Sequence, residues 1–121
     1  MGQNNEFRTT GQTRVLAIHD LCGVGKCSLT AALPILSAAG VETCALPTAI
    51  FSNHTAFSSF VSRDLNDFLL PMAEAIKVQG FHFDAIYTGY LANADQAGII
   101  SDVITLLADE DTKIVVDPAM A

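Results

Sequence analysis

The chain has 121 residues and half of them are hydrophobic, which is enough for the core of one ordinary domain. Six Lys and Arg residues stand against 13 Asp and Glu residues, so the net charge is −7 and no basic cluster could follow a phosphate backbone. These properties exclude a disordered chain and argue against nucleic acid as a partner.

The ends of the chain and its cysteines indicate a cytoplasmic protein without a membrane segment. The longest apolar stretch, residues 29–41, is interrupted by Pro34 and Gly40 and is shorter than the roughly 20 residues that cross a bilayer. Residues 1–13 are polar and are predicted to be a disordered extension, with the folded domain over residues 14–121. None of the cysteines has the two-residue spacing of zinc or redox sites, so we expect reduced thiols at Cys22, Cys27 and Cys44.

Strands and helices alternate in the first half of the chain. The apolar run 14–19 predicts a buried strand, and the glycines that follow permit a tight bend. A helix is predicted over 28–39, ended by Gly40, and a second strand over 41–46, ended by Pro47. Residues 48–55 are predicted to form a loop.

The same alternation continues in the second half. A long helix is predicted to begin at a cap on Ser62, with Pro71 kinking or splitting it. Its buried face consists of residues at three- and four-residue spacing: Leu65, Phe68, Leu69, Met72 and Ile76. A strand over 84–88, a helix after Asn93 and a strand over 113–116 follow. This order predicts an α/β fold in three layers, with helices on both faces of a mostly parallel sheet.

Unusual polar residues follow each predicted strand. Parallel strands end at one edge of the sheet, where ligands bind near a switch in strand order. The residues that this ordering brings to the edge are Asp20, the segment 51–55, Tyr90 and Asp117. We therefore expect one ligand site there.

The segment Phe51-Ser52-Asn53-His54-Thr55 is the most informative of these. Its aromatic, amide, imidazole and hydroxyl groups can stack on a flat ring and bond to its edge, as a small heteroaromatic ligand requires. The alternative is a polar turn in which Ser52 and Asn53 bond the local backbone and His54 lies in solvent.

The other candidate residues carry two interpretations each. Asp20 is either a turn residue or a carboxylate that accepts hydrogen bonds from a ligand, and Asp117 either starts a turn before Pro118 or helps to hold Mg²⁺ near nucleotide phosphates. The segment around Gly23 and Gly25 fails the Walker spacing, so we expect these glycines to let the backbone pass close to a ligand.

The histidines indicate no catalytic base. No nucleophile with a matching partner can be placed beside His54, so hydrogen bonding or packing suits it better. His19 and His82 have no recognisable partners in the sequence and are interpreted as structural.

Taken together, the segments 51–55, Thr88-Gly89-Tyr90 and Val116-Asp117-Pro118 resemble successive signatures of the pyridoxal kinases, a branch of the ribokinase superfamily. The resemblance runs from about Arg14 to Ala121 and implies a truncated three-layer ribokinase-like fold. It also implies ATP-dependent phosphorylation of the 5′-hydroxyl of pyridoxal, pyridoxine or pyridoxamine, in a cytoplasmic enzyme that is a homodimer when full length.

By the same resemblance, five residues bind the vitamer and one lies near the nucleotide. Asp20 contacts the polar substituents of the pyridine ring, Phe51 and His54 border the ring, Thr55 bonds it, and Tyr90 lines the pocket. Asp117 matches the acidic residue near the ATP phosphates and magnesium.

The sequence departs from the family pattern in three places. Many relatives have Ser at Asp20, which affects preference among vitamers; Ala56 replaces a common Gly; and Ala119 and Ala121 replace a bulkier residue and a Gly. A relative would continue with a glycine-rich anion hole, the catalytic Asp and an adenine pocket, so no catalytic residue is expected within this chain. We therefore expect the N-terminal, vitamer-binding half of a kinase that is inactive alone, with one sheet edge and several helix faces uncovered. The alternatives are a hydroxymethylpyrimidine kinase and a catalytically dead module that binds a vitamer or dimerises.

Overall fold

The computed structural model describes residues 12–25, 28–89 and 94–117, which form one sheet flanked by helices. The strands lie in the order β3-β2-β1-β4-β5. Their bounds are β1 Arg14–Val24, β2 Glu42–Asn53, β3 Ser62–Asp64, β4 Ala85–Thr88 and β5 Lys113–Val116. The helices are α1 Leu29–Ala38, α2 Asn66–Val78 and α3 Ala94–Leu107. The predictions for Tyr90, Asn93, Pro118 and the polar extension up to residue 11 lie outside the described residues.

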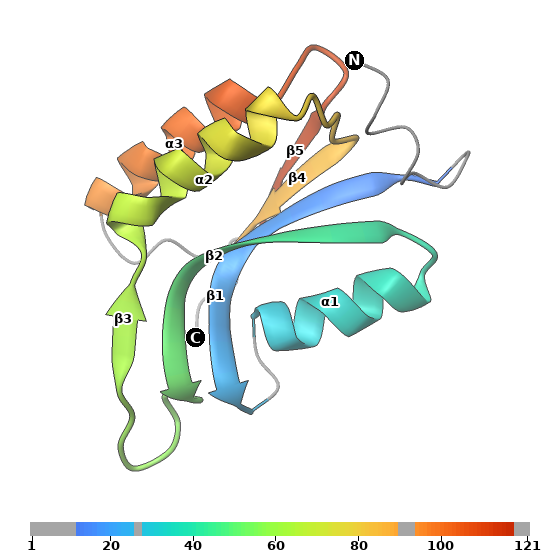
Figure 1. Ribbon diagram of the computed structural model, residues 1–121. Coiled ribbons are helices and arrows are strands. Elements are labelled where there is room, and N and C mark those ends of the chain that lie inside the picture. The colour runs from blue at the N-terminus through green and yellow to red at the C-terminus, as the bar shows by residue number, and fades with distance from the viewer. Residues whose placement is uncertain (1–11, 26–27, 90–93, 118–121) are drawn as a thin grey trace.

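The predicted α/β class is confirmed. β1 pairs in parallel with β2 and with β4, and β4 pairs in parallel with β5. Figure 1 shows α2 and α3 together on one side of the sheet and α1 on the other. The result is a three-layer arrangement in which the carboxyl ends of the four parallel strands point the same way.

The hydrophobic core lies between the sheet and the α2–α3 pair. Alternate residues of β1 and β4, Leu16, Ile18 and Ile86, are at most 1% exposed and pack against Leu69 of α2 and Val103 of α3. Burying an aliphatic side chain of this size stabilises a fold by about 1.5–3 kcal/mol. This layer is therefore the main source of stability for the described residues.

The two central strands run further than the sequence predicts. β1 continues to Val24, and β2 passes through Pro47 to Asn53, so most of the predicted 48–55 loop is strand. Proline is tolerated in β2 because β3 pairs only with Ala49 to Phe51, leaving Pro47 without a neighbour on that side. The prediction that Pro47 ends the strand was wrong for this reason.

The start of the long helix also differs from the prediction. Ser62 lies in β3, a short antiparallel strand that the sequence analysis missed because all three of its residues are exposed and none is apolar. The helix begins at Asn66, whose backbone N–H donates to Asp64 Oδ1 at 3.2 Å. Pro71 lies inside α2 without splitting it.

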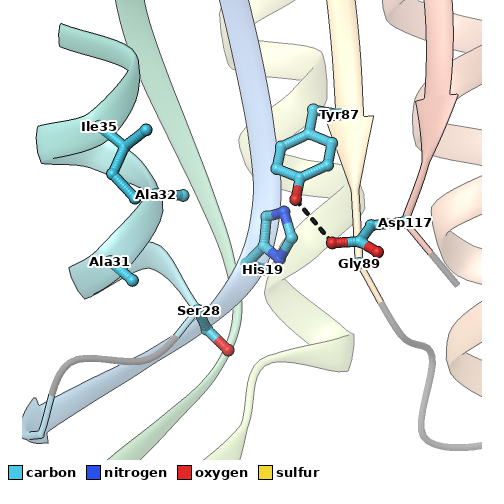
Figure 2. Close-up of a pocket in the computed structure, with 8 residues that line it drawn as sticks. All are labelled: His19, Ser28, Ala31, Ala32, Ile35, Tyr87, Gly89 and Asp117. Atoms are coloured by element: carbon cyan, nitrogen blue, oxygen red, sulfur yellow. Dashed lines mark hydrogen bonds between the residues drawn. The ribbon is translucent and has the colours of Figure 1, made fainter. Parts of the chain in front are cut away.

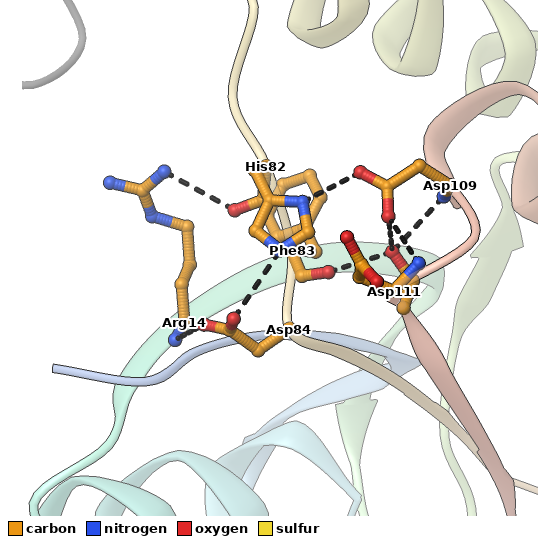
Figure 3. Close-up of polar contacts among 7 residues, drawn as sticks. Arg14, His82, Phe83, Asp84, Asp109 and Asp111 are labelled. Atoms are coloured by element: carbon orange, nitrogen blue, oxygen red, sulfur yellow. Dashed lines mark hydrogen bonds and ion pairs between the residues drawn. The ribbon is translucent and has the colours of Figure 1, made fainter. Parts of the chain in front are cut away.

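A polar cluster joins the amino ends of the parallel strands (Figure 3). Arg14 is 1% exposed; its Nε donates to Glu42 Oε2 at 3.1 Å, and its backbone N–H donates to Asp84 Oδ2 at 2.8 Å. His82 contacts Asp84 and Asp109, with 2.7 Å between its Nδ1 and Asp109 Oδ2. These contacts fix the start of β1 against the segments that lead into β4 and β5.

The described chain begins slightly before the first strand. The backbone N–H of Glu42 donates to Thr13 O at 2.8 Å, and Gln12 Nε2 donates to Gly40 O. The domain boundary at residue 14 stays a prediction. No helix in the described ranges is both long and apolar enough to cross a membrane.

Candidate functional site

An open hollow of about 310 Å³ lies between α1 and the carboxyl ends of β1 and β4 (Figure 2). Its lining combines small or apolar residues of α1 with polar residues from the strand ends: His19, Ser28, Ala31, Ala32, Ile35, Tyr87, Gly89 and Asp117. The volume is at the lower end of the range for small-molecule sites.

Asp20 lies at an irregularity of β1, where the pairing with β2 shifts between His19 and Leu21. Its Oδ1 accepts a hydrogen bond of 2.6 Å from Ser28 Oγ. Ser28 has a φ of 50°, which is rare outside glycine and costs about 1–3 kcal/mol. Strain of this kind collects at ligand sites, and here it places a hydroxyl directly on the Asp20 carboxylate.

A second group centres on His19, which the sequence analysis did not place in a site. Its ring packs against Tyr87 with 4.6 Å between centroids. It also lies so close to Gly89 that a Cβ there would be 2.5 Å from Nδ1, so any larger residue would force the imidazole to move. Tyr87 in turn donates to Asp117 Oδ2 at 2.9 Å, as Figure 2 shows.

The electrostatics of this group favour a neutral imidazole. Burial lowers the pKa of His19 below its ordinary value, against the opposing effect of the Asp20 and Asp117 carboxylates. Burial, and then the hydrogen bond to Asp117, raise the pKa of Tyr87. His19 Nε2 is buried and has no hydrogen-bond partner among the described residues. No sequence signal reveals this group, because it depends on the register that places Tyr87 beside β1.

The Phe51–Thr55 segment lies at the end of β2. Asn53 donates to the carbonyls of His54 and Ser59, and Ser52 Oγ accepts from the Val61 backbone N–H at 2.9 Å. For these two side chains the polar-turn interpretation therefore holds. His54 Nδ1 accepts from the Ala56 backbone N–H at 2.9 Å, which leaves Nε2 as the ring's donor when the imidazole is neutral.

The two glycines after β1 have a structural role against this segment. A Cβ on Gly23 would lie 2.8 Å from Ser52 O, and a Cβ on Gly25, whose φ is 107°, would lie 2.9 Å from His54 Cβ. The backbone at these glycines thus passes close to β2 and the residue after it. The sequence analysis instead expects the glycines to let the backbone pass close to a ligand. His54 is also held by its backbone N–H, which donates to Val24 O at 2.9 Å.

The predicted site residues fall into two groups. Asp20 and Asp117 both lie close enough to His19 to act on its charge, and Asp117 lines the hollow. His54 and Thr55 lie beyond the paired ends of β1 and β2, and the four residue steps from Asp20 to Val24 span about 13 Å of strand. Phe51 is on this projecting part, with its ring 5.7 Å from that of Phe60. Tyr90 is outside the described residues.

Within the described ranges no group of three or more His, Cys, Asp and Glu residues could hold a metal ion by itself. Mg²⁺ in phosphoryl-transfer sites commonly needs only one or two carboxylates, with phosphate oxygens and water completing its shell. Asp117 is a single carboxylate at the carboxyl end of β5, so it fits that limited requirement.

No protein-family model matches the chain. The fold is similar to that of a Bacteroides thetaiotaomicron protein, provisionally named a phosphomethylpyrimidine kinase and solved with pyridoxal, at a TM-score of 0.83 and 43% identity. Pyridoxal kinase from Lactobacillus plantarum is similar at a TM-score of 0.77 and 29% identity. The chain matches part of the pyridoxal kinase and phosphomethylpyrimidine kinase fold of the ribokinase superfamily.

The matches cover most of this chain but a minor part of each relative. The shares of this chain are 91% and 90%, and the shares of the Bacteroides and Lactobacillus chains are 38% and 39%. Pyridoxal kinase from Leishmania donovani, solved with ADP and pyridoxamine, shares the fold at a TM-score of 0.71 and 24% identity, with 41% of its length covered. The resemblance inferred from the sequence is confirmed, and this chain spans about two fifths of the kinases it matches.

Proposed function

We propose that this chain supplies the vitamer-binding part of a kinase that transfers phosphate from ATP to the 5′-hydroxyl of pyridoxal, pyridoxine or pyridoxamine. The observation that carries the proposal is the 43% identity, over 91% of this chain, to a protein solved with pyridoxal. Kinases of this fold solved with ADP or pyridoxal phosphate are consistent with the same chemistry.

The proposed ring-binding groups are Phe51, His54 and Thr55 on the projecting end of β2 and Asp20 at the base of that projection, together with Tyr90 from outside the described part. Asp20 is oriented by the 2.6 Å hydrogen bond from Ser28 Oγ to its Oδ1 and by the contact of Cys22 Sγ with its Oδ2 at 3.9 Å. The bond from Ala56 to His54 Nδ1 fixes which imidazole nitrogen can donate. Donors and acceptors held in this way select a heteroaromatic ring by its substituents. A ring whose polar substituents find no partner in the site would lose their hydrogen bonds to water without replacement.

Asp117 is the proposed contact with the nucleotide side. When bound, Mg²⁺ would neutralise charge on the transferred phosphoryl group. Tyr87 donates a 2.9 Å hydrogen bond to Asp117 Oδ2, and this bond restricts the orientation of the carboxylate. ATP and Mg²⁺ are thus the proposed cofactors, and a homodimer the proposed form of the complete enzyme.

Binding and turnover are expected to separate in this chain. Phosphoryl transfer depends on positioning and on stabilising developing charge, and the chain corresponds to only 38–40% of the length of three of the chains it matches. A hydroxymethylpyrimidine kinase is the second candidate, favoured by the provisional name of the Bacteroides protein. A vitamer-binding module without catalysis is the third.

A titration of the purified chain with pyridoxal and with hydroxymethylpyrimidine tests the proposal. The chain contains three histidines, so the imidazole NMR signals separate the regions of the molecule. Pyridoxal is expected to shift the His54 signals and to leave those of His82, at the opposite end of the strands, unchanged.

His54→Ala provides the matched variant. It should weaken pyridoxal binding about tenfold or more, as loss of a hydrogen bond in a desolvated site does, while His82→Ala should leave the affinity unchanged. An unmoved His54 signal at millimolar pyridoxal would refute the vitamer site. Tighter binding of hydroxymethylpyrimidine would favour the second candidate.

A further inference from the structure

Asp20 carries a negative charge that its hydrogen bonds do not balance. Its Oδ1 accepts from Ser28 Oγ at 2.6 Å, and its Oδ2 lies 3.9 Å from Cys22 Sγ. A hydroxyl and a thiol are neutral donors, so they orient the carboxylate without compensating its charge. The amide oxygen of an asparagine would accept the same hydrogen bond from Ser28. Holding Ser28 therefore does not require a charge at this position.

The positively charged side chains of the described ranges lie away from Asp20. Arg14 is at the amino end of β1, Lys77 is in the last turn of α2, and Lys113 begins β5. Arg63 is on β3, which is separated from β1 by β2. The ion pairs among the described residues involve other carboxylates and leave out Asp20.

Two groups close to Asp20 compensate its charge only in part. Burial lowers the pKa of His19 below its ordinary value, which favours a neutral imidazole at pH 7. Ser28 directly precedes α1, and the amino end of a helix is equivalent to roughly half an elementary positive charge. Lys26 is outside the described residues. Part of the Asp20 charge is thus left for a ligand to balance.

Asp20 is also placed where a ligand of the proposed vitamer site would meet it. It lies at the irregularity of β1, at the base of the projecting ends of β1 and β2, and it is only partly buried. Asp117 is a second carboxylate near His19, and the net charge of the chain is −7. The local and the overall charge therefore both favour a cationic ligand.

We propose that Asp20 makes the vitamer site selective for pyridoxamine over pyridoxine and pyridoxal. Of the three, pyridoxamine alone carries a net positive charge at neutral pH, because its aminomethyl group is protonated. An ammonium donor gives the half-buried carboxylate a charge-assisted hydrogen bond, which is about twice as strong as a bond between neutral groups. This inference rests on the proposed vitamer site and adds the charge of the preferred substrate.

Titrations that compare pyridoxamine with pyridoxine test the proposal, because the two molecules differ only in an ammonium or a hydroxyl group on one substituent. Binding to the full 121-residue chain is followed through the imidazole NMR signals of His54, which report occupancy without involving Asp20 directly. Pyridoxamine is expected to bind at least about tenfold more tightly. Raising the salt concentration should narrow the difference, because salt screens the attraction between charges.

Asp20→Asn removes the charge and keeps an acceptor for Ser28. It should abolish the preference for pyridoxamine and change the affinity for pyridoxine by less than about threefold. Asp95→Asn is the matched control, because it changes the net charge of the chain by the same amount. Asp95 is an exposed residue in the first turn of α3, on the side of the sheet opposite α1, so this variant should keep the preference.

The comparison of the two vitamers in the unsubstituted chain does not depend on any variant folding. Equal affinities, tighter binding of pyridoxine, or a preference that survives Asp20→Asn would overturn the proposal and leave the vitamer site standing. An equal loss of affinity for both vitamers in Asp20→Asn would also overturn it, because Asp20 would then meet a group that the two share. If neither vitamer binds at millimolar concentration, the proposed function itself fails, and the preference fails with it.

Discussion

The two faces of the sheet differ in how completely they are covered. On the α2–α3 face, Leu16, Ile86 and Ile100 are at most 1% exposed and form one continuous core. On the α1 face, Ala17 is fully buried, but Ile35 of α1 is 68% exposed. β5 is exposed on both faces, at Val115 on the α1 side and at Ile114 on the other. The closely packed core therefore lies on one face, while the other combines the hollow, the strained Ser28 and a buried nitrogen of His19 that has no partner among the residues that the structure describes.

The close-packed core and the hollow of the candidate site thus lie on opposite faces of the sheet. A layer that is close-packed resists any change of volume, whereas an open layer can accept a ligand or another chain at little cost. Making the same substitution at one position in each region is the most direct way to sharpen the comparison.

The largest effect is expected from a pair of isoleucines. Ile100→Ala on α3 removes a side chain that is 1% exposed and should lower the free energy of unfolding by about 2–5 kcal/mol, because it leaves a cavity. Ile35→Ala on α1, at 68% exposure, should change it by about 0.5 kcal/mol or less. Chemical denaturation of both variants measures the difference. Equal losses would show that the α1 face is as closely packed as the other.

A pair of glycines tests the close approach at the hollow. Gly89→Ala would place a Cβ 2.5 Å from His19 Nδ1 and should cost about 1–3 kcal/mol, as overpacking does. Gly98→Ala in α3 meets nothing within 4 Å and should stabilise the helix by about 0.5–1 kcal/mol.

The double variant His19→Ala/Gly89→Ala identifies the cause of the Gly89 effect. With the imidazole removed, the added methyl group should cost much less than it does alone, giving a coupling free energy between the two positions. Additive costs would mean that contact with His19 does not explain why glycine is needed.

The smallest effect concerns the polar cluster at the amino ends of the strands (Figure 3). The Asp111 backbone N–H, and then the contact with His82, lower the pKa of Asp109 below its ordinary 3.8. A carboxylate with a depressed pKa stabilises the fold above its unfolded pKa, and that contribution is lost as the pH falls through the folded pKa. Asp109→Asn should therefore be less stable than the unsubstituted chain at pH 7, and thermal unfolding curves should converge once the pH lies below the folded pKa of Asp109. A difference that does not change between pH 7 and pH 2 would contradict this assignment.

The sequence predicts the layers of the fold more reliably than the details of the strands. Apolar runs identify β1, β4 and β5. Along α2, Leu69, Met72 and Ile76 contact the core as predicted, but the prediction for Phe68 was wrong, because it is 53% exposed. β3 is too short and polar to show any periodicity, and Pro47 ends a strand only if both of its sides are paired. Local propensity could not reveal either outcome, because both depend on which strands become neighbours.

The candidate site is predictable only in part for a related reason. Asp20 and Asp117 follow predicted strands, so their proximity to the same edge comes from topology alone. The roles of His19, Tyr87 and Gly89 depend on a register that fixes which side chains meet, and no spacing in the sequence encodes it. The ends of β1 and β2 project beyond the rest of the sheet, and this projection separates His54 from Asp117. The sequence analysis could not anticipate the separation, because it predicted that the second strand ends at residue 46.

The most direct test of the central claim measures binding and turnover in one sample. The 121-residue chain is mixed with pyridoxal, ATP and Mg²⁺, and bound pyridoxal is followed through the His54 signals while pyridoxal 5′-phosphate is quantified. The account predicts saturable binding with product at the background rate. Rapid formation of pyridoxal 5′-phosphate by the chain alone, or no binding at millimolar pyridoxal, would contradict it.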